Sequence, residues 1–297
     1  AESEAEAEAD VGDSLDILLS ILTPHTEAEI LLDSTTPQGQ AFGKLIEELD
    51  ASDSAADEIR VQQRYALMST YFATDGDSWT NRDGWDTFSE NECDWYGISN
   101  CKSFEDGRKT VTGINLGKNN LKGPIPSELC ALPDPDFFLL DLGENDLGGN
   151  IPECIIEFRS LENLQIFGAQ LSGNLPAGLL TIPALTKLQL YDNNFSGTLD
   201  VLFEESDSYD NGHISIYRDS SFSSMLQDLR LHNNKLEGTI PALFGNFYVL
   251  KTLHLWGNDL TGGVTESGVC ELRRSEDLQV FEADCQEIGC TCCSDCK

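Results

Sequence analysis

From residue 114 onward, apolar residues recur in short runs of the form Leu-x-Leu, each followed by an Asn and then by a Gly-x-Ile-Pro turn. An apolar residue at every second position predicts a short strand that buries one face. Six runs match and a seventh is degraded, with the Asn-equivalent positions at 119, 145, 169, 193, 234, 258 and 283. The steps are 26, 24, 24, 41, 24 and 25 residues. The pattern therefore predicts seven stacked coils of about 24 residues, with one insertion of roughly 17 residues.

Each recurrent position has a structural role. Stacked coils pair their Leu-x-Leu strands into a parallel sheet along one side. The Asn side chain is expected to satisfy backbone groups where the chain turns inside the stack, because buried polar groups need partners. Gly gives the torsional freedom for the next bend, and Pro ends the ladder of hydrogen bonds. Since Ala169 and Ala283 stand in place of Asn, we expect this ladder to lose two rungs.

The repeated pattern resembles the plant-type leucine-rich repeat, LxxLxLxxNxLxGxIP. The resemblance implies an α/β solenoid, a right-handed leucine-rich-repeat superhelix of about seven coils with a concave parallel β-sheet. Upstream of the repeats, residues 64–72 have helical spacing, and a tryptophan-rich run ends in Cys93-Asp-Trp95-Tyr-Gly97-Ile98-Ser-Asn-Cys101. This run resembles the N-terminal cap of plant-type repeat ectodomains. That resemblance implies a Cys93–Cys101 disulfide and tryptophans that form the core of a helical cap.

These patterns divide the chain into four parts. Residues 1–62 form an acidic N-terminal tail and a helical segment, and residues 63–108 form the N-terminal cap. Residues 109–265 hold the leucine-rich repeats, with an acidic insertion at about 204–221, and residues 266–297 hold the last repeat and a Cys-rich C-terminal cap. The insertion lacks the twelfth-position Glu of an EF-hand, so we expect a solvated loop in preference to a calcium site. The C-terminal cap resembles the ends of repeat proteins of diatoms and related algae.

The chain has ten cysteines, of which two lie in the N-terminal cap, two in the first coils and six near the C-terminus. They are Cys93, Cys101, Cys130, Cys154, Cys270, Cys285, Cys290, Cys292, Cys293 and Cys296. Their even number and clustering predict disulfides and an oxidising compartment. Cys130 and Cys154 follow successive Ile-Pro turns at nearly equivalent places in adjacent coils, which suits a disulfide. The six terminal cysteines allow 15 pairings, which stay open. A thiolate zinc site at the C-terminus is the alternative, but it explains neither Cys93 and Cys101 nor the even total.

The charge is one-sided, with 18 Lys and Arg against 52 Asp and Glu, a net of −34. Such a surface repels phosphate backbones, which excludes a nucleic-acid partner, and it disfavours docking on anionic lipid. The apolar stretches are too short to span a bilayer, so we expect no membrane insertion of this chain. The disulfides and an N-terminus without Met predict a secreted, extracellular or cell-surface protein that has lost a signal peptide.

Recognised catalytic motifs do not occur: the chain has no Gly-rich phosphate loop, HExxH or Gly-x-Ser-x-Gly. His232 and His254 fall on adjacent coils, where they could hold a metal with Asp228 or Glu282 nearby, but a His pair on an exposed sheet is more often plain surface. We therefore expect no enzyme activity, no cofactor and no metal site. Asn194-Phe-Ser196 is a glycosylation sequon at an exposed turn position, and its glycosylation is a further prediction.

The candidate ligand site follows from the strand period. The residue just after each Leu-x-Leu should point out of the concave sheet, as should the residue between the two leucines. The first column holds five rings: Phe167, Tyr191, His232, Trp256 and Phe281. The second column is polar and includes Gln165, Gln189, Arg230, His254 and Gln279. Large aromatics usually seek burial, so an exposed aromatic ladder predicts a site for an extended peptide or a glycan.

The alternative is that these rings pack on one another or under a terminal cap, and Phe281, nearest the C-terminal cap, is the first candidate for burial. For the whole chain three functions remain. The resemblance to extracellular plant-type repeats, including receptor ectodomains, implies a recognition module for a peptide, protein or glycan, with a co-receptor as a further partner. The alternatives are a secreted inhibitor of wall-degrading hydrolases, as in the plant polygalacturonase inhibitors, and a structural or adhesive cell-wall protein. The fold permits all three.

Overall fold

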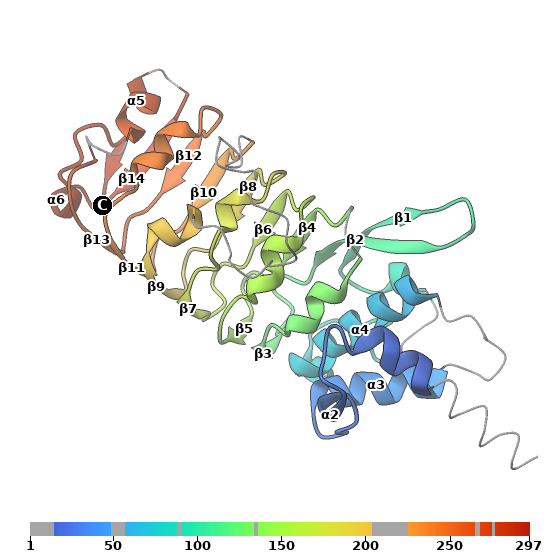
Figure 1. Cartoon of the computed structure of the whole chain (residues 1–297). Helices are drawn as coiled ribbons and strands as arrows, with labels where there is room; N and C mark the ends of the chain where they lie inside the picture. Colours follow the sequence, from blue (N-terminus) through green and yellow to red (C-terminus); the bar gives the residue numbers. More distant parts are fainter. Residues whose placement is uncertain are drawn as a thin grey trace, which may run out of the picture.

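The computed structural model describes residues 15–48, 57–87, 91–133, 136–203, 225–264, 268–274 and 277–297. The acidic tail expected at residues 1–10 and the insertion expected at about 204–221 lie outside these residues. The described chain is an elongated solenoid, with helices at its N-terminal end, stacked coils in the middle and a small cap at its C-terminal end (Figure 1).

The coils stack through one large sheet, which has nine strands within the described ranges. In their order across the sheet these are β1 Ile98–Ser103, β2 Lys109–Asn115, β4 Leu139–Asp141, β6 Asn163–Gln165, β8 Lys187–Gln189, β10 Asp228–Arg230, β12 Thr252–His254, β14 Val280–Ala283 and β15 Asp295–Cys296. β1 and β2 are antiparallel, and all later neighbours are parallel. The expected architecture, a leucine-rich-repeat α/β solenoid, is confirmed.

The strand centres of successive coils lie beside one another and form the core. In sheet order they are Ile114, Leu140, Leu164, Leu188, Leu229, Leu253 and Phe281. None of these side chains is more than 1% exposed. One apolar residue per coil at this position therefore builds a continuous hydrophobic column, which is what the Leu-x-Leu period predicts.

The last coil differs from the expected alignment. Phe281 lies at the strand centre beside Leu253 and is fully buried, so its predicted place in the exposed ring column is wrong. Leu278 precedes Phe281 by three residues, as Leu250 precedes Leu253, and both leucines are buried. The run from Leu278 to Ala283 has apolar residues that fit two registers. Packing the large Phe ring into the core decides between them.

Buried asparagines link neighbouring coils, as the sequence predicted. The side-chain oxygen of Asn145 accepts from the backbone N–H groups of Asn119 and Leu121 in the preceding coil, at 3.0 and 3.1 Å. Its side-chain nitrogen donates to the carbonyl oxygens of Leu116 and Leu142. The same two-sided bonding recurs at Asn193, Asn234 and Asn258.

The two expected gaps in this ladder have different outcomes. Ala169 does interrupt it and is fully buried. Ala283 does not correspond to an Asn: in the corrected register it is a core residue, 1% exposed. Asp284 follows it and accepts from the backbone N–H groups of Gly257 and Asn258, so a carboxylate ends the ladder.

Away from the large sheet the coils turn through short strands and 3-10 helices. The strands are β3 Lys122–Pro124, β5 Asp146–Gly148, β7 Ser172–Asn174, β9 Asn194–Thr198, β11 Lys235–Gly238 and β13 Asp259–Leu260. The 3-10 helices are η3 Ser127–Ala131, η4 Glu153–Glu157, η5 Leu179–Thr181, η6 Leu199–Phe203 and η7 Ala242–Asn246. At Gly197 φ is +84°, and a Cβ would lie 2.8 Å from Oδ1 of Asn174, so both torsion and space require Gly.

A helical unit covers the N-terminal end of the stack. It comprises a helix at residues 15–22, α2 Ala28–Leu31, α3 Pro37–Glu48 and α4 Glu58–Ala73, which runs through the boundary at 62/63 suggested by the sequence. These helices enclose a second apolar core around Leu18, Phe42 and Tyr65. The unit is tied to the first coil by Glu128 of η3, whose carboxylate accepts from Thr26 Oγ1 and Gln38 Nε2.

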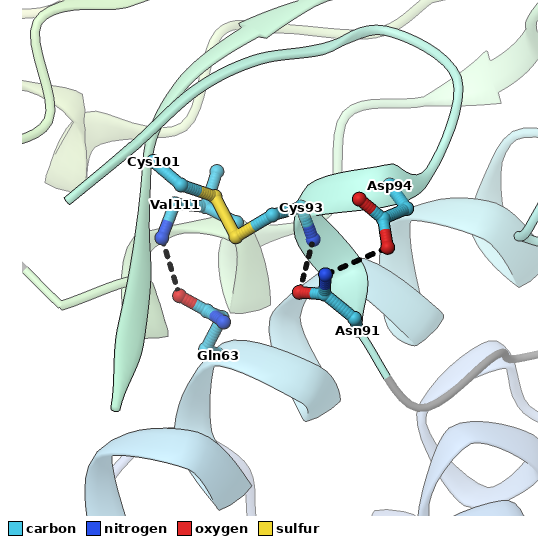
Figure 2. Close-up of a disulfide and its surroundings, with 6 residues drawn as sticks. All are labelled: Gln63, Asn91, Cys93, Asp94, Cys101 and Val111. Carbon is cyan, nitrogen blue, oxygen red and sulfur yellow. Dashed lines mark hydrogen bonds between the residues drawn. A yellow bond between two sulfur atoms is a disulfide. The ribbon is translucent and has the colours of Figure 1, made fainter. Parts of the chain in front are cut away.

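The chain then forms the cap, which precedes the first coil in sequence and contains η1 Gly76–Ser78 and η2 Glu92–Asp94. Its three tryptophans at positions 79, 85 and 95 are at most 5% exposed, so they form cap core as predicted. Figure 2 shows the Cys93–Cys101 disulfide beside Gln63 of α4, whose Oε1 accepts from the backbone N–H of Val111 in β2. The disulfide and this hydrogen bond hold η2, α4 and the projecting β1–β2 hairpin together (Figure 1).

All ten cysteines lie in the described ranges, and every one is in a disulfide. Cys93–Cys101 and Cys130–Cys154 are the two pairs that the sequence predicted, and the second joins η3 to η4. The C-terminal cap contains α5 Val269–Arg274 and α6 Cys285–Ile288. Its six cysteines pair as Cys270–Cys292, Cys285–Cys296 and Cys290–Cys293. Their sulfurs are therefore bonded to one another and do not form the alternative thiolate zinc site.

A candidate ligand-binding face on the concave sheet

Four rings from four adjacent coils form one stack on the concave sheet. Phe167 stacks on Tyr191, with ring centroids 4.6 Å apart and planes 7° apart. Tyr191 stacks on His232 at 4.5 Å and 8°, and His232 stacks on Trp256 at 4.7 Å and 25°. Each ring lies two residues beyond a strand of the sheet. Of the five rings in the predicted column, the structure brings these four together and places Phe281 in the core.

The stack covers the faces of its inner rings. Tyr191 and His232 each have a ring neighbour on both sides. Phe167 packs against Gly143, where a Cβ would come within 2.8 Å of the ring. Phe167, Tyr191 and Trp256 are nevertheless only half-buried. The rings thus pack on one another, as the alternative interpretation held, and they still present a shared surface to solvent.

His232 is the most enclosed member of the stack, at 9% exposed. Burial, reinforced by the nearby His254, lowers the pKa of its imidazole to about 4, so His232 is neutral at pH 7. Its Nδ1 and the Nε1 of Trp256 are buried without a hydrogen-bond partner among the described residues. An unpaired buried polar atom costs about 1–3 kcal/mol, so two atoms of the stack are energetically unsatisfied.

The polar column beside the stack is organised by Asp228, which the sequence analysis named only as a possible metal partner and did not place in this column. Asp228, the first residue of β10, accepts from Gln189 Nε2 at 2.7 Å and from Arg230 Nε at 2.8 Å. Gln165 lies half-buried in the same column. The signal for Asp228 was available, because it precedes Arg230 by two residues and therefore shares its face of the strand.

The C-terminal end of this column was mispredicted together with Phe281. In the observed register Glu282, and not Gln279, follows His254 across the sheet. His254 Nε2 lies 3.9 Å from Glu282 Oε2, and Lys297 Nζ lies 3.6 Å from Glu282 Oε1. Burial lowers the pKa of His254, against the opposing effect of the Glu282 charge. A His, a carboxylate and an ammonium group thus border the ring stack at this end.

Other candidate features lie elsewhere on the chain. Asn194 of the glycosylation sequon is exposed at the start of β9. Within the described ranges, the one group of three or more possible metal ligands that converge is Cys285, Cys290 and Cys293, and all three are in disulfides. No helix in the described part of the chain is long and apolar enough to cross a membrane.

Comparisons of the sequence with known proteins identify the repeat. The family model Leucine Rich Repeat matches residues 225–247. Receptor-like protein 38 of Arabidopsis thaliana is 46% identical over 56 residues, which are 18% of this chain and 7% of that protein. This chain therefore spans only a small part of the length of that relative.

Comparisons of the structure extend the likeness to most of the chain. The leucine-rich-repeat ectodomain of the Arabidopsis thaliana membrane receptor kinase GASSHO1/SCHENGEN3, solved in complex with CASPARIAN STRIP INTEGRITY FACTOR 2, matches with a TM-score of 0.53 and 28% identity, over 67% of this chain and 21% of that one. The ectodomain of the Arabidopsis thaliana receptor kinase SOBIR1 matches in fold, with a TM-score of 0.51 and 22% identity, over 67% of this chain and 94% of that one. The chain thus carries a leucine-rich repeat at residues 225–247 and shares the solenoid fold of these plant receptor ectodomains.

Proposed function

We propose that this chain is an extracellular recognition module that binds an extended peptide segment, free or within a protein, along its concave sheet. The observation that carries the proposal is the continuous stack of Phe167, Tyr191, His232 and Trp256, half-exposed beside a polar column. Exposed aromatic clusters of this kind cost free energy in a chain that has no partner for them. A ligand that covers the stack removes that cost.

The ring geometry favours a peptide over a glycan. A sugar ring stacks on an open aromatic face, but both faces of Tyr191 and His232 are already covered. The stack offers ring edges, which carry the positive end of the aromatic quadrupole and attract carbonyl oxygens. An extended peptide backbone presents such oxygens at regular intervals. With strands about 4.8 Å apart, four rings span roughly 14 Å, the length of about four extended residues.

The polar column supplies hydrogen bonds along the same path. Gln189 and Arg230 are both oriented by Asp228, so their donors are held in place before a ligand arrives. His254 and Glu282 continue the column at the C-terminal end. Preorganised polar groups beside an apolar strip are typical of ligand sites in which a few directional contacts give specificity.

The comparisons and the cysteines support an extracellular, receptor-like role. The GASSHO1/SCHENGEN3 ectodomain was solved with a bound partner, CASPARIAN STRIP INTEGRITY FACTOR 2, and Receptor-like protein 38 shares the repeat sequence. Ten cysteines in five disulfides suit an oxidising compartment outside the cytosol.

The proposal is tested by selecting binders from a displayed library of random peptides and by screening a glycan array with the full chain. We expect peptides whose Kd rises at least about tenfold with Tyr191→Ala or Trp256→Ala, a loss of roughly 1.4 kcal/mol or more. Tyr248→Ala is the matched control, because Tyr248 lies outside the ring column and is 68% exposed. Binders that tolerate both column substitutions, or that Tyr248→Ala weakens equally, would contradict the site. Glycan binding that is lost in Tyr191→Ala would contradict the proposal that the ligand of this site is a peptide.

A further inference from the structure

Three sulfurs from two different disulfides converge in the C-terminal cap. The Sγ atoms of Cys285, Cys290 and Cys293 lie within 4.8 Å of one another. Cys285 is bonded to Cys296, and Cys290 is bonded to Cys293. Thiol–disulfide exchange needs a thiolate within contact of a disulfide sulfur. Breaking the Cys290–Cys293 bond would therefore create a nucleophile next to the Cys285–Cys296 bond, with little movement of the backbone.

The Cys290–Cys293 bond constrains the fold less than its counterparts do. Its cysteines are three residues apart, whereas Cys130–Cys154 spans 24 residues and Cys270–Cys292 spans 22. The constraint that a disulfide places on the unfolded chain grows with the length of the loop that it closes. A bond that closes so short a loop contributes little to holding the coils together.

Access to solvent differs among the cysteines of the cap. Cys290 and Cys293 are half-buried, and Cys296 is exposed. Cys292 is half-buried as well, but its partner Cys270 is 3% exposed and lies in the core. A reductant can thus approach either cysteine of the Cys290–Cys293 pair, and Cys296 of the Cys285–Cys296 pair, whereas in Cys270–Cys292 one of the two cysteines is buried.

We propose that Cys290–Cys293 is a thiol–disulfide exchange site that is reduced by a dithiol and then exchanges with the Cys285–Cys296 bond, which releases Cys296 as a thiol. One sulfur of the dithiol forms a mixed disulfide with the pair, and its second sulfur then displaces the protein sulfur. The dithiol is oxidised to a disulfide, and two electrons and two protons pass to Cys290 and Cys293. A thiolate of the pair next attacks Sγ of Cys285, bonds to it and expels Cys296 as a thiolate, which takes up a proton. This second step consumes no further electrons.

The transfer has a structural consequence at the edge of the concave sheet. β15 is only two residues long and ends at Cys296, so the Cys285–Cys296 bond is what holds it covalently beside β14. Lys297, the next residue, lies 3.6 Å from Glu282. Expelling Cys296 leaves β15 held beside β14 by hydrogen bonds alone, which loosens the ion pair at Glu282.

The experiment titrates the oxidised full chain with limiting dithiothreitol in the presence of a chelator, so that freed thiolates hold no metal ion. Samples are quenched with acid and alkylated, and the labelled cysteines are mapped by mass spectrometry. We expect the cysteines of the C-terminal cap, including Cys296, to be alkylated at a rate at least about tenfold higher than Cys93 or Cys130. We also expect a non-native Cys285–Cys290 or Cys285–Cys293 linked peptide after one equivalent of dithiothreitol. This readout in the unaltered chain needs no variant.

A double substitution tests the relay directly. In Cys290→Ser/Cys293→Ser, labelling of Cys296 should slow at least about tenfold, because the internal nucleophile is gone. Cys130→Ser/Cys154→Ser removes a different disulfide and should leave the rate at Cys296 unchanged. The proposal is overturned if cap cysteines react no sooner than Cys93, if no non-native linked peptide forms, or if Cys296 reacts equally fast without Cys290 and Cys293.

Discussion

At the scale of single residues, His232 combines roles that rarely coincide. It is a central ring of the stack, it is almost fully buried, and its Nδ1 has no partner among the described residues. Burial disfavours the imidazolium ion, and the neighbours that act on it oppose one another: His254 and Arg230 lower its pKa, while Asp192 and Glu282 raise it. A ring kept neutral can stack on Tyr191 and Trp256 without carrying a charge into the stack.

The pH dependence of stability follows from this pKa. In the unfolded chain His232 titrates near 6.5, and in the folded chain burial lowers its pKa to about 4. Between these values the unfolded state binds more protons, so acid destabilises the fold. Lowering the pH from 8 to 5 should cost about 2 kcal/mol through this residue. Urea unfolding of the wild type and of His232→Phe, which keeps a ring in the stack, measures the difference. An equal acid-induced loss in both proteins would rule out His232 as its source.

At the scale of elements, the coils are joined by shared asparagine side chains as well as by strand pairing. Each such Asn bonds to backbone groups of its own coil and of the preceding coil, so it fixes the stagger between them. Asn145, Asn193 and Asn234 are at most 8% exposed, whereas Asn258 near the C-terminal end of the stack is half-buried. Ala169 shows that one rung can be absent when strand pairing continues on both sides.

Removing a rung that exists is a different matter, because its backbone partners are arranged for it. Asn145→Ala leaves two N–H groups and two carbonyl oxygens short of a partner in a buried turn, which should lower the free energy of unfolding by about 3 kcal/mol. Asn163→Ala is the control, since Asn163 in β6 makes no side-chain hydrogen bond in the described part of the chain and should change stability by less than about 0.5 kcal/mol. Denaturant titration of both variants measures the free energy of unfolding. Similar losses in the two variants would mean that the asparagine ladder contributes no more to stability than an asparagine outside it.

At the scale of the whole molecule, the net charge of −34 dominates the electrostatics. Repulsion among like charges favours expansion, and it is strongest when the Debye length is long, about 30 Å at 0.01 M salt. Ion pairs such as Arg64 with Glu92 neutralise single carboxylates, but 18 basic residues cannot offset 52 acidic ones.

The melting temperature should therefore rise with ionic strength. Between 0.01 and 0.15 M sodium chloride the Debye length falls from about 30 to about 8 Å, which screens most of the repulsion between separate coils. Thermal unfolding followed by circular dichroism measures the rise, and added sucrose at low salt controls for general solute effects. A melting temperature that stays flat across this range would show that the charges are locally compensated.

The amino-acid sequence by itself determined the features that repeat over short distances. The stack of coils, the buried leucines, the stacked column from Phe167 to Trp256 and the Cys130–Cys154 bond all follow from a period of about 24 residues. This is because each depends only on a residue's place within its own coil and on the same place in the next. Local alternation also indicates which side chains face outward, although Asp228 shows that a second outward position can be overlooked.

The tertiary structure alone decided the features that do not repeat from coil to coil. The last coil is followed by the cap strand β15 and not by a matching repeat, so its register was settled by the packing of Phe281 into the core and of the cap against β14. The pairing of the six terminal cysteines depends on which Cβ atoms approach one another, which no spacing rule ranks among 15 possibilities. The docking of the helical unit through Thr26 and Glu128 joins residues 102 positions apart. Contacts of such separation follow from the shapes of complete surfaces, which exist only once the coils and helices have formed.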